Sequence, residues 1–182
     1  MVLCARCHDE VTHGKVPEDE QRSWKANPYN IVHGHPGGRL RVNQQTPVLA
    51  LGQSRIENCP RVFVIGRETI LGMKVEDNRL LLSLRLYDQS DTLLLEVVEN
   101  HWIFGDSQPW DFVSKWRYLR LRQAERQVQI ELDARHEPIR IKGQFWRNGH
   151  SYVVDNTKLL IDGNLRLTVD ARHCAIAIMI PD

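Results

Sequence analysis

The sequence has no long hydrophobic run and almost no net charge, and both absences narrow its function. No apolar stretch among its 182 residues approaches the roughly 18–20 residues that a transmembrane helix needs. The N-terminal apolar stretch is too short for a signal peptide. The 24 basic and 23 acidic residues leave a net charge of +1, which gives no overall attraction to nucleic acid or an anionic membrane. We therefore expect a cytoplasmic protein without a membrane partner, in which any contact with a polyanion depends on a local patch.

Cysteine is also scarce, since four residues are fewer than a small disulfide-stabilised secreted domain carries. Cys59 and Cys174 lie in apolar, strand-like sequence, which is typical of reduced and buried thiols. Cys4 and Cys7 are separated by two residues, a spacing with which two thiolates can hold one tetrahedral zinc ion from a single turn. The sequence therefore predicts a structural zinc site that contains Cys4 and Cys7.

Four of the eight histidines lie within the first 46 residues, in the same segment as this cysteine pair. His8 and His13 are the nearest candidates for the third and fourth zinc ligands, and His33 or His35 could approach from a glycine-rich stretch over residues 30–46. The Cys-x-x-Cys-His string is also the attachment signature of covalent heme. Heme attachment requires export, and the sequence offers no export signal and no clear second axial ligand. The identity of the remaining zinc ligands stays open.

The string LCARCHDEVTHGK, within about the first 15 residues, resembles the C-terminal end of HNH endonucleases. The resemblance implies that Cys4 and Cys7 bind structural Zn²⁺ and that His8 or His13 is the catalytic histidine that binds Mg²⁺ or Mn²⁺. The family's first Cys-x-x-Cys and its general-base histidine precede this string, and here only three residues precede Cys4. The resemblance therefore implies the tail of a DNA-directed HNH module with weak or no cleavage on its own, unless a histidine of the glycine-rich stretch supplies the base.

The pattern of the sequence changes near residue 46. The preceding part predicts two short helices, one over about residues 7–13 that ends at Gly14 and one that begins at Pro17 and ends before Asn27-Pro28. From Pro47 onward, apolar and polar residues alternate instead. We therefore divide the chain into an HNH-like zinc knuckle with a glycine-rich linker over residues 1–46 and an all-β domain over residues 47–182.

Alternation with period two is typical of half-buried strands. The sharpest turn signal between them is Asn148-Gly149, since both central positions of a type I′ turn need a positive φ. Turns at intervals of roughly 8–12 residues favour an antiparallel β sandwich or barrel, with a β-helix as the alternative. The residues that alternation assigns to the buried faces include Leu80, Leu82, Leu84, Leu86, Leu93, Leu95, Val97, Val128, Ile130, Leu132, Ile139, Ile141, Phe145, Leu165, Leu167, Val169, Ile176, Ile178 and Ile180.

A second candidate site lies within residues 116–122 of the predicted β domain. If this segment is a strand, Leu119 and Leu121 face the core and the aromatic and basic side chains share the other face. Aromatic rings stack on bases and guanidinium groups bind phosphates, so such a face suits single-stranded nucleic acid. The alternative is a solvated strand face whose charge is offset by Asp111 and Glu125. The candidate nucleic-acid-binding residues are Trp116, Arg117, Tyr118, Arg120 and Arg122.

Two functions from different classes fit these features. The first is an HNH-endonuclease-like protein that is associated with metal and directed to DNA. The second is a non-enzymatic, β-rich module that binds a protein partner and carries a zinc knuckle at its N-terminus. The sequence contains no phosphate-binding P-loop and no Gly-x-Ser-x-Gly nucleophile elbow, so it gives the β domain no catalytic motif of its own.

Overall fold

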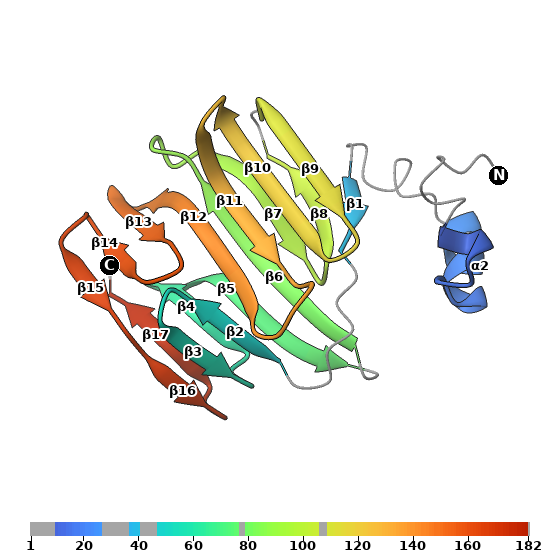
Figure 1. Ribbon diagram of the computed structural model, residues 1–182, viewed down its shortest axis with the longest axis horizontal. Coiled ribbons are helices and arrows are strands. Elements are labelled where there is room, and N and C mark those ends of the chain that lie inside the picture. The colour runs from blue at the N-terminus through green and yellow to red at the C-terminus, as the bar shows by residue number, and fades with distance from the viewer. Residues whose placement is uncertain (1–9, 27–36, 41–46, 77–78, 106–108, 182) are drawn as a thin grey trace. The chain divides into compact units, whose positions relative to one another are not determined.

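The computed structural model describes residues 10–26, 37–40, 47–76, 79–105 and 109–181 (Figure 1). The chain divides into two compact units, Met1–Gly37 and Gly38–Asp182. No helix in these described ranges is long and apolar enough to cross a bilayer. The second unit begins before the boundary expected at residue 46, because Leu40 is fully buried and donates its N–H to the Asn100 carbonyl at 2.8 Å.

The N-terminal unit contains two helical segments, as the sequence predicts. Residues 10–12 are helical, and the Gly14 N–H closes the following turn by donating to the Val11 carbonyl at 3.0 Å. Helix α2 (Glu18–Ala26) follows Pro17, and its first turn is acidic, which suits the positive end of the helix dipole. The predicted zinc ligands Cys4, Cys7 and His8 lie outside the described residues, as do His33, His35 and most of the expected linker.

The second unit is mainly β, as predicted, and consists of two sheets that do not close into a barrel (Figure 1). Sheet A has the strand order β1 (Gly37–Arg39), β8 (His101–Phe104), β7 (Leu93–Val98), β6 (Arg79–Tyr87), β5 (Glu68–Glu76), β4 (Arg61–Ile65) and β17 (Ile176–Ile180). Sheet B has the order β15 (Leu165–Leu167), β14 (Leu159–Ile161), β13 (His150–Val154), β12 (Ile139–Arg147), β11 (Gln127–Asp133), β10 (Tyr118–Ala124) and β9 (Asp111–Lys115). Three more strands extend sheet B beside β12, namely β2 (Val48–Leu51), β3 (Ser54–Glu57) and β16 (Asp170–Arg172).

The two sheets pack face to face around one hydrophobic core. Phe63 of sheet A contacts both Phe145 and Tyr152 of sheet B, with ring centroids 5.9 and 5.5 Å apart. The alternating leucines of β6 are buried, as the period-two pattern predicts. The β12–β13 turn is also confirmed, since Asn148 and Gly149 both have positive φ. The fold is therefore a sandwich, and neither the barrel nor the β-helix describes it.

The sandwich is not purely antiparallel, which corrects the expectation from the sequence. Three strand pairs are parallel: β2 with β12, β3 with β16, and β4 with β17. Parallel strands need a connection that crosses from one end of the sheet to the other. Here the partners are separated by many intervening strands, so no local pattern in the sequence could have indicated them.

Two predicted core positions are wrong. Val128 is exposed and its neighbour Gln129 is buried, because a register shift between Leu121 and Arg122 places an extra residue in β11. Gly143 of β12 approaches the Gln129 carbonyl so closely that a Cβ there would lie 2.2 Å from the oxygen, at a φ of 152°. Leu165, in the edge strand β15, is also exposed. Alternation therefore fails at a bulge and at a sheet edge.

Two chain segments cross from sheet B to sheet A side by side. Residues of β3 pair with β16, and residues of β4 pair with β17, always with a sequence separation of 115, as in Arg55 with Asp170 and Ile65 with Ile180. Between the sheets, the same separation joins Cys59 to Cys174 in a disulfide. The expectation that these cysteines are reduced is therefore corrected, because parallel pairing across 115 residues brings together two thiols that look unrelated in the sequence.

Candidate nucleic-acid interface

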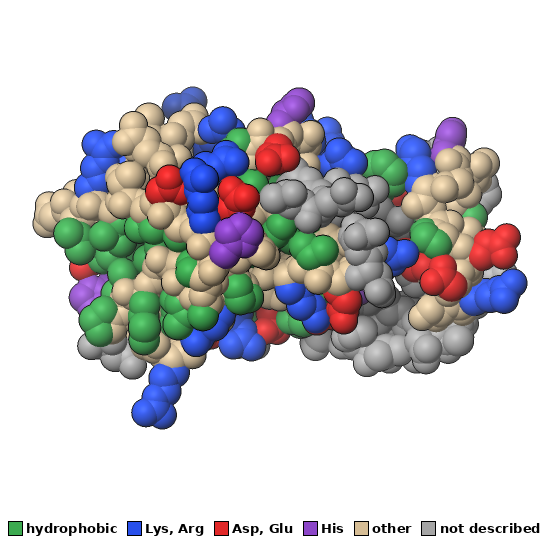
Figure 2. Space-filling model, turned by 90° about the horizontal axis from the view of Figure 1, so that it is seen from below, with side chains coloured by type: hydrophobic (Ala, Val, Ile, Leu, Met, Phe, Trp, Pro, Cys, Tyr) green, Lys and Arg blue, Asp and Glu red, His purple; other side chains and the backbone are tan. Residues whose placement is uncertain are grey.

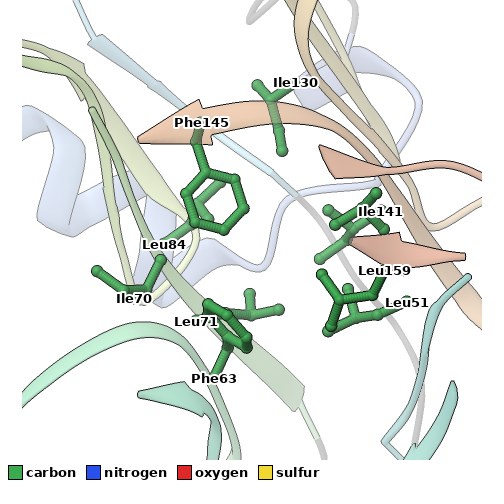
Figure 3. Close-up of a pocket in the computed structure, with 10 residues that line it drawn as sticks. Leu51, Phe63, Ile70, Leu71, Leu84, Ile130, Ile141, Phe145 and Leu159 are labelled. Carbon is green, nitrogen blue, oxygen red and sulfur yellow. The ribbon is translucent and has the colours of Figure 1, made fainter. Parts of the chain in front are cut away.

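One cavity between the two sheets is small and entirely apolar. Its volume is about 20 Å³, and its lining side chains are all apolar, with Phe63 and Leu71 on one side and Ile141 and Leu159 on the other (Figure 3). A volume of this size fits about one water molecule, which would need polar partners that the lining lacks. This cavity is therefore too small and too apolar to be a substrate site.

The described residues contain no group of three or more His, Cys, Asp or Glu side chains that could hold a metal ion. His13 is the one predicted metal-binding residue within the described ranges, and it lies exposed in the turn after residues 10–12. The zinc and catalytic-metal predictions for Cys4, Cys7 and His8 fall outside these ranges. The second candidate site, residues 116–122, lies entirely within the described ranges and includes most of strand β10.

Strand β10 has the orientation that the sequence predicts. Leu119 and Leu121 are fully buried, and Tyr118, Arg120 and Arg122 point to the outer face of sheet B. Trp116 and Arg117 are not on the strand, because they form the turn between β9 and β10. The expectation that Trp116 continues the strand face is thus corrected, while Arg117 lies half-buried beside the start of β10.

The middle of this outer face carries ion pairs. The Asp111 carboxylate lies 3.7 Å from the Arg122 guanidinium and 4.0 Å from that of Arg120. Across β11, Glu131 pairs with Lys142 at 3.5 Å and accepts a hydrogen bond from the Tyr118 hydroxyl at 3.1 Å. A single carboxylate serves two guanidinium groups at long distance, so Arg120 and Arg122 are incompletely neutralised.

One end of the face is formed by a row of residues in register across four strands. Tyr118 pairs with Lys115 of β9 on one side and with Asp133 of β11 on the other, and Asp133 in turn pairs with Arg140 of β12. Arg117, in the β9–β10 turn, completes this end. In the part of the chain that the structure describes, Lys115, Arg117 and Arg140 have no ion-pair partner. We call Lys115, Arg117, Tyr118, Asp133, Arg135 and Arg140 the basic row.

Arg135 of the basic row is held by the Asp133 carboxylate and by the Tyr118 ring. Its guanidinium donates two hydrogen bonds to the Asp133 carboxylate, Nε to Oδ1 at 2.9 Å and Nη2 to Oδ2 at 2.6 Å. Its backbone N–H donates to the same carboxylate. The guanidinium carbon lies 4.9 Å from the ring centroid of Tyr118. The side chain nevertheless remains 58% exposed, so the guanidinium is held in place while still open to solvent.

These contacts shift two pKa values. The hydrogen bonds from the Arg135 side chain hold the pKa of Asp133 below its ordinary value. Burial, followed by the hydrogen bond to Glu131, raises the pKa of Tyr118. At neutral pH the row therefore contains a carboxylate that stays ionised, a phenol that stays neutral and an arginine clamped between them.

The outer face has an excess of positive charge that the whole chain lacks. Figure 2 shows acidic and basic side chains interspersed over one face of the molecule, as expected for a net charge of +1. With the β9–β10 turn and the β11–β12 loop included, the outer face of β9–β12 has seven cations against four carboxylates. These are Lys115, Arg117, Arg120, Arg122, Arg135, Arg140 and Lys142 against Asp111, Glu131, Asp133 and Glu137. The β10–β11 turn adds one charge of each sign, Arg126 and Glu125, and so leaves the excess unchanged.

The candidate residues named from the sequence leave out four of these cations, namely Lys115, Arg135, Arg140 and Lys142. The candidates were limited to residues 116–122, because no other positive region was recognised in the chain. The alternation of β12 does indicate two of these four cations. Arg140 lies between the buried residues Ile139 and Ile141, and Lys142 follows Ile141, so both basic side chains point to the face opposite the core. Antiparallel pairing of β10, β11 and β12 places those positions beside Tyr118 and Arg120.

A second arginine–tyrosine contact joins the two sheets. Arg147 of β12 lies over the Tyr87 ring of β6 at 4.3 Å and pairs with Glu68 of β5 at 2.7 Å. The Tyr87 hydroxyl donates to Glu68 at 2.5 Å, and Arg85 lies 3.2 Å from the same carboxylate. We call Glu68, Arg85, Tyr87 and Arg147 the inter-sheet cluster. Because Arg147 of sheet B pairs with Glu68 of sheet A, this cluster holds the two sheets together.

Comparison with other proteins adds no residue assignments. No protein-family model matches the chain, and no match is found among curated proteins or solved structures. The roles of the residues on the outer face must therefore be inferred from their geometry and charge.

Proposed function

We propose that the β domain binds DNA through the outer face of β9–β12 and that the chain is an HNH-endonuclease-like protein directed to DNA. The observation that carries this proposal is the excess of cations on that face, three of which have no carboxylate partner among the described residues. An unpaired surface cation can neutralise a phosphate and release its condensed counterion, which supplies most of the free energy of sequence-independent binding. Cations already paired with carboxylates supply much less.

Binding to DNA can be tested by fluorescence anisotropy with a labelled duplex over a range of salt concentrations. We expect salt-sensitive binding that weakens in Arg117→Ala/Arg140→Ala, with a salt dependence reduced by about one unit of slope for each phosphate contact removed. The matched control is Arg67→Ala/Arg79→Ala, which removes two exposed cations of sheet A and changes the net charge equally. Equal weakening in both variants would mean that the outer face has no special role.

The HNH-like part of the proposal rests on the resemblance of LCARCHDEVTHGK. We infer that Cys4 and Cys7 bind Zn²⁺ and that His8 or His13 contributes to a Mg²⁺ or Mn²⁺ site. Elemental analysis should find zinc in the purified protein and lose it in Cys4→Ala/Cys7→Ala, while circular dichroism still reports the β domain. Unchanged zinc content in the double variant would refute the ligand assignment.

We further infer weak or no DNA cleavage by this chain. The matched residues supply candidate metal ligands, but none of them corresponds to the general base of the family, and a general base contributes about 10²–10⁴-fold to rate. A plasmid-nicking assay with added Mg²⁺ or Mn²⁺ is the direct measurement. Robust metal-dependent nicking that disappears in both His8→Ala and His13→Ala would show instead that the chain supplies its own base, with His33 and His35 the next residues to substitute.

A further inference from the structure

We infer that Arg135 and Tyr118 form a platform on which a base of single-stranded DNA stacks. This inference rests on the proposed function and specifies the form of DNA that the outer face binds. It starts from the geometry of one side chain: the Arg135 guanidinium carbon lies over the Tyr118 ring at 4.9 Å from its centroid, the guanidinium is held by Asp133, and the side chain is still 58% exposed. The ring lies on one side of the guanidinium, and the 58% exposure of the side chain leaves area open to a ligand.

The clamp matters because arginine side chains are normally mobile. An exposed arginine loses rotamer entropy when it orders on a ligand, which weakens the net interaction. Here two side-chain hydrogen bonds and one backbone hydrogen bond to Asp133 have already fixed the guanidinium plane. A base that stacks on this plane therefore meets a preorganised surface that also carries a positive charge.

The geometry favours unpaired bases over a duplex. In a double helix both faces of each base are covered by neighbouring base pairs, so a guanidinium plane can reach only phosphates and groove edges. Splayed bases of a single strand expose their faces, and stacking on aromatic or guanidinium planes is the usual way in which proteins hold them. The described residues of 38–182 also include no helix that could enter a major groove.

The rest of the basic row suits the backbone of such a strand. Lys115 is in register with Tyr118, Arg140 is in register with Asp133, and Arg117 directly precedes Tyr118 in the β9–β10 turn. None of these three cations has a carboxylate partner within the described residues. Phosphates on either side of a stacked nucleotide can therefore contact cations that are not already neutralised. The platform supplies the preference for a single strand, and the surrounding cations supply salt-dependent affinity for any nucleic acid.

The test uses the full chain and fluorescence anisotropy with three probes: oligo(dT) of about 20 nucleotides, a DNA duplex of similar length and oligo(rU). We expect oligo(dT) to bind about tenfold more tightly than the duplex at the same salt concentration. The decisive variant is Arg135→Lys, which keeps the charge but removes the plane. It should weaken oligo(dT) binding about five- to tenfold and leave duplex binding unchanged.

The matched control is Arg79→Lys, because Arg79 is an exposed arginine of β6 in sheet A and lies outside the outer face of β9–β12. It should leave both affinities unchanged, and thermal unfolding should verify that each variant is folded. Equal or tighter binding of the duplex, or wild-type oligo(dT) affinity in Arg135→Lys, would overturn the platform while the proposed DNA binding stands. Tighter binding of oligo(rU) than of oligo(dT) would overturn the assignment to DNA. Failure of every probe to bind at low salt would refute the proposed function itself.

Discussion

The molecule contains two arginine–tyrosine–carboxylate groups of similar chemistry in different surroundings. In the inter-sheet cluster, Arg147 lies over Tyr87 and pairs with Glu68; on the outer face, Arg135 lies over Tyr118 and pairs with Asp133. The difference is burial, since Arg147 is 27% exposed and Arg135 is 58% exposed. The Arg147 side chain is therefore largely enclosed by protein, whereas more than half of the Arg135 side chain remains accessible to a ligand.

This difference in exposure gives the two groups different roles, since the inter-sheet cluster contributes to stability and the exposed group to ligand binding. When one member of a charged pair between two sheets is removed, water has little access to the remaining charge, which is left poorly solvated. A charged pair on an exposed face is readily replaced by water and contributes little to folding. Its effect on a ligand can nevertheless be large, because a fixed and open guanidinium is ready to bind. The comparison predicts opposite outcomes for the same substitution in the two groups.

The largest expected effect is on stability in Arg147→Ala. The change leaves Glu68 with only Arg85 and Tyr87 as partners, and we expect the free energy of unfolding to fall by about 2 kcal/mol. Arg135→Ala should leave the free energy of unfolding unchanged. Urea unfolding followed by tryptophan fluorescence measures both. An equal loss in the two variants would remove the distinction between the groups.

A smaller effect is expected when the two hydroxyls are removed. Tyr87→Phe deletes the donor to Glu68 at the edge of the core and should lower the free energy of unfolding by about 1 kcal/mol. Tyr118→Phe deletes a donor to Glu131 on the half-exposed outer face and should lower it by less than about 0.5 kcal/mol. Thermal unfolding of the two variants side by side tests the ranking, and a reversed order would contradict it.

Alkaline pH should affect the inter-sheet cluster through Tyr87. Burial and the hydrogen bond to Glu68 raise the pKa of Tyr87 to about 12, whereas an unfolded tyrosine titrates near 10. The unfolded chain therefore loses this proton first, so the contribution of Tyr87 is intact below about pH 10 and declines as pH rises toward 12. Unfolding measured across this range should be less pH-dependent in Tyr87→Phe. An unaltered profile in that variant would assign the decline to other groups.

Acidic pH should act on the same cluster in the opposite sense. Burial tends to raise the pKa of Glu68, but the hydrogen bond from Tyr87 and the charges of Arg147 and Arg85 outweigh it, so this pKa lies below its ordinary value. The contribution of Glu68 is therefore complete above the unfolded pKa of about 4.3 and is lost as pH falls below it. Glu68→Gln should reduce this acid dependence. Retention of the full dependence would place it elsewhere.

Local patterns in the sequence predict much of the fold. Alternation identifies the buried leucines of β6 and the orientation of Leu119 and Leu121, and Asn148-Gly149 marks its turn, because each depends only on neighbouring residues. The errors occur where pairing between strands decides the outcome. The parallel pairs and the Cys59–Cys174 disulfide depend on strands that lie far along the chain. The bulge at Gln129 depends on the register between β10 and β11, which the alternation within one strand does not show.

The candidate interface shows the same division. Tyr118, Arg120 and Arg122 can be recognised from one strand, since period two puts them on one face. Arg135 and Arg140 cannot, because their proximity to Tyr118 requires the β10–β11 and β11–β12 pairings. The ion pair of Arg135 with Asp133 is local in sequence, but the position of its guanidinium over the Tyr118 ring depends on the pairing of two strands.

The constant separation of 115 residues between the two crossing segments has a consequence for synthesis of the protein. The edge of β3 and β4 cannot be covered until the ribosome has added the residues of β16 and β17. At about 5–20 residues per second, that delay is roughly 6–23 s. During this interval the strands from β5 to β16 are added while β4 keeps an open edge, which is prone to pair with other chains. Synthesis of β17 therefore determines when the edge of β4 in the newly made domain is protected from aggregation.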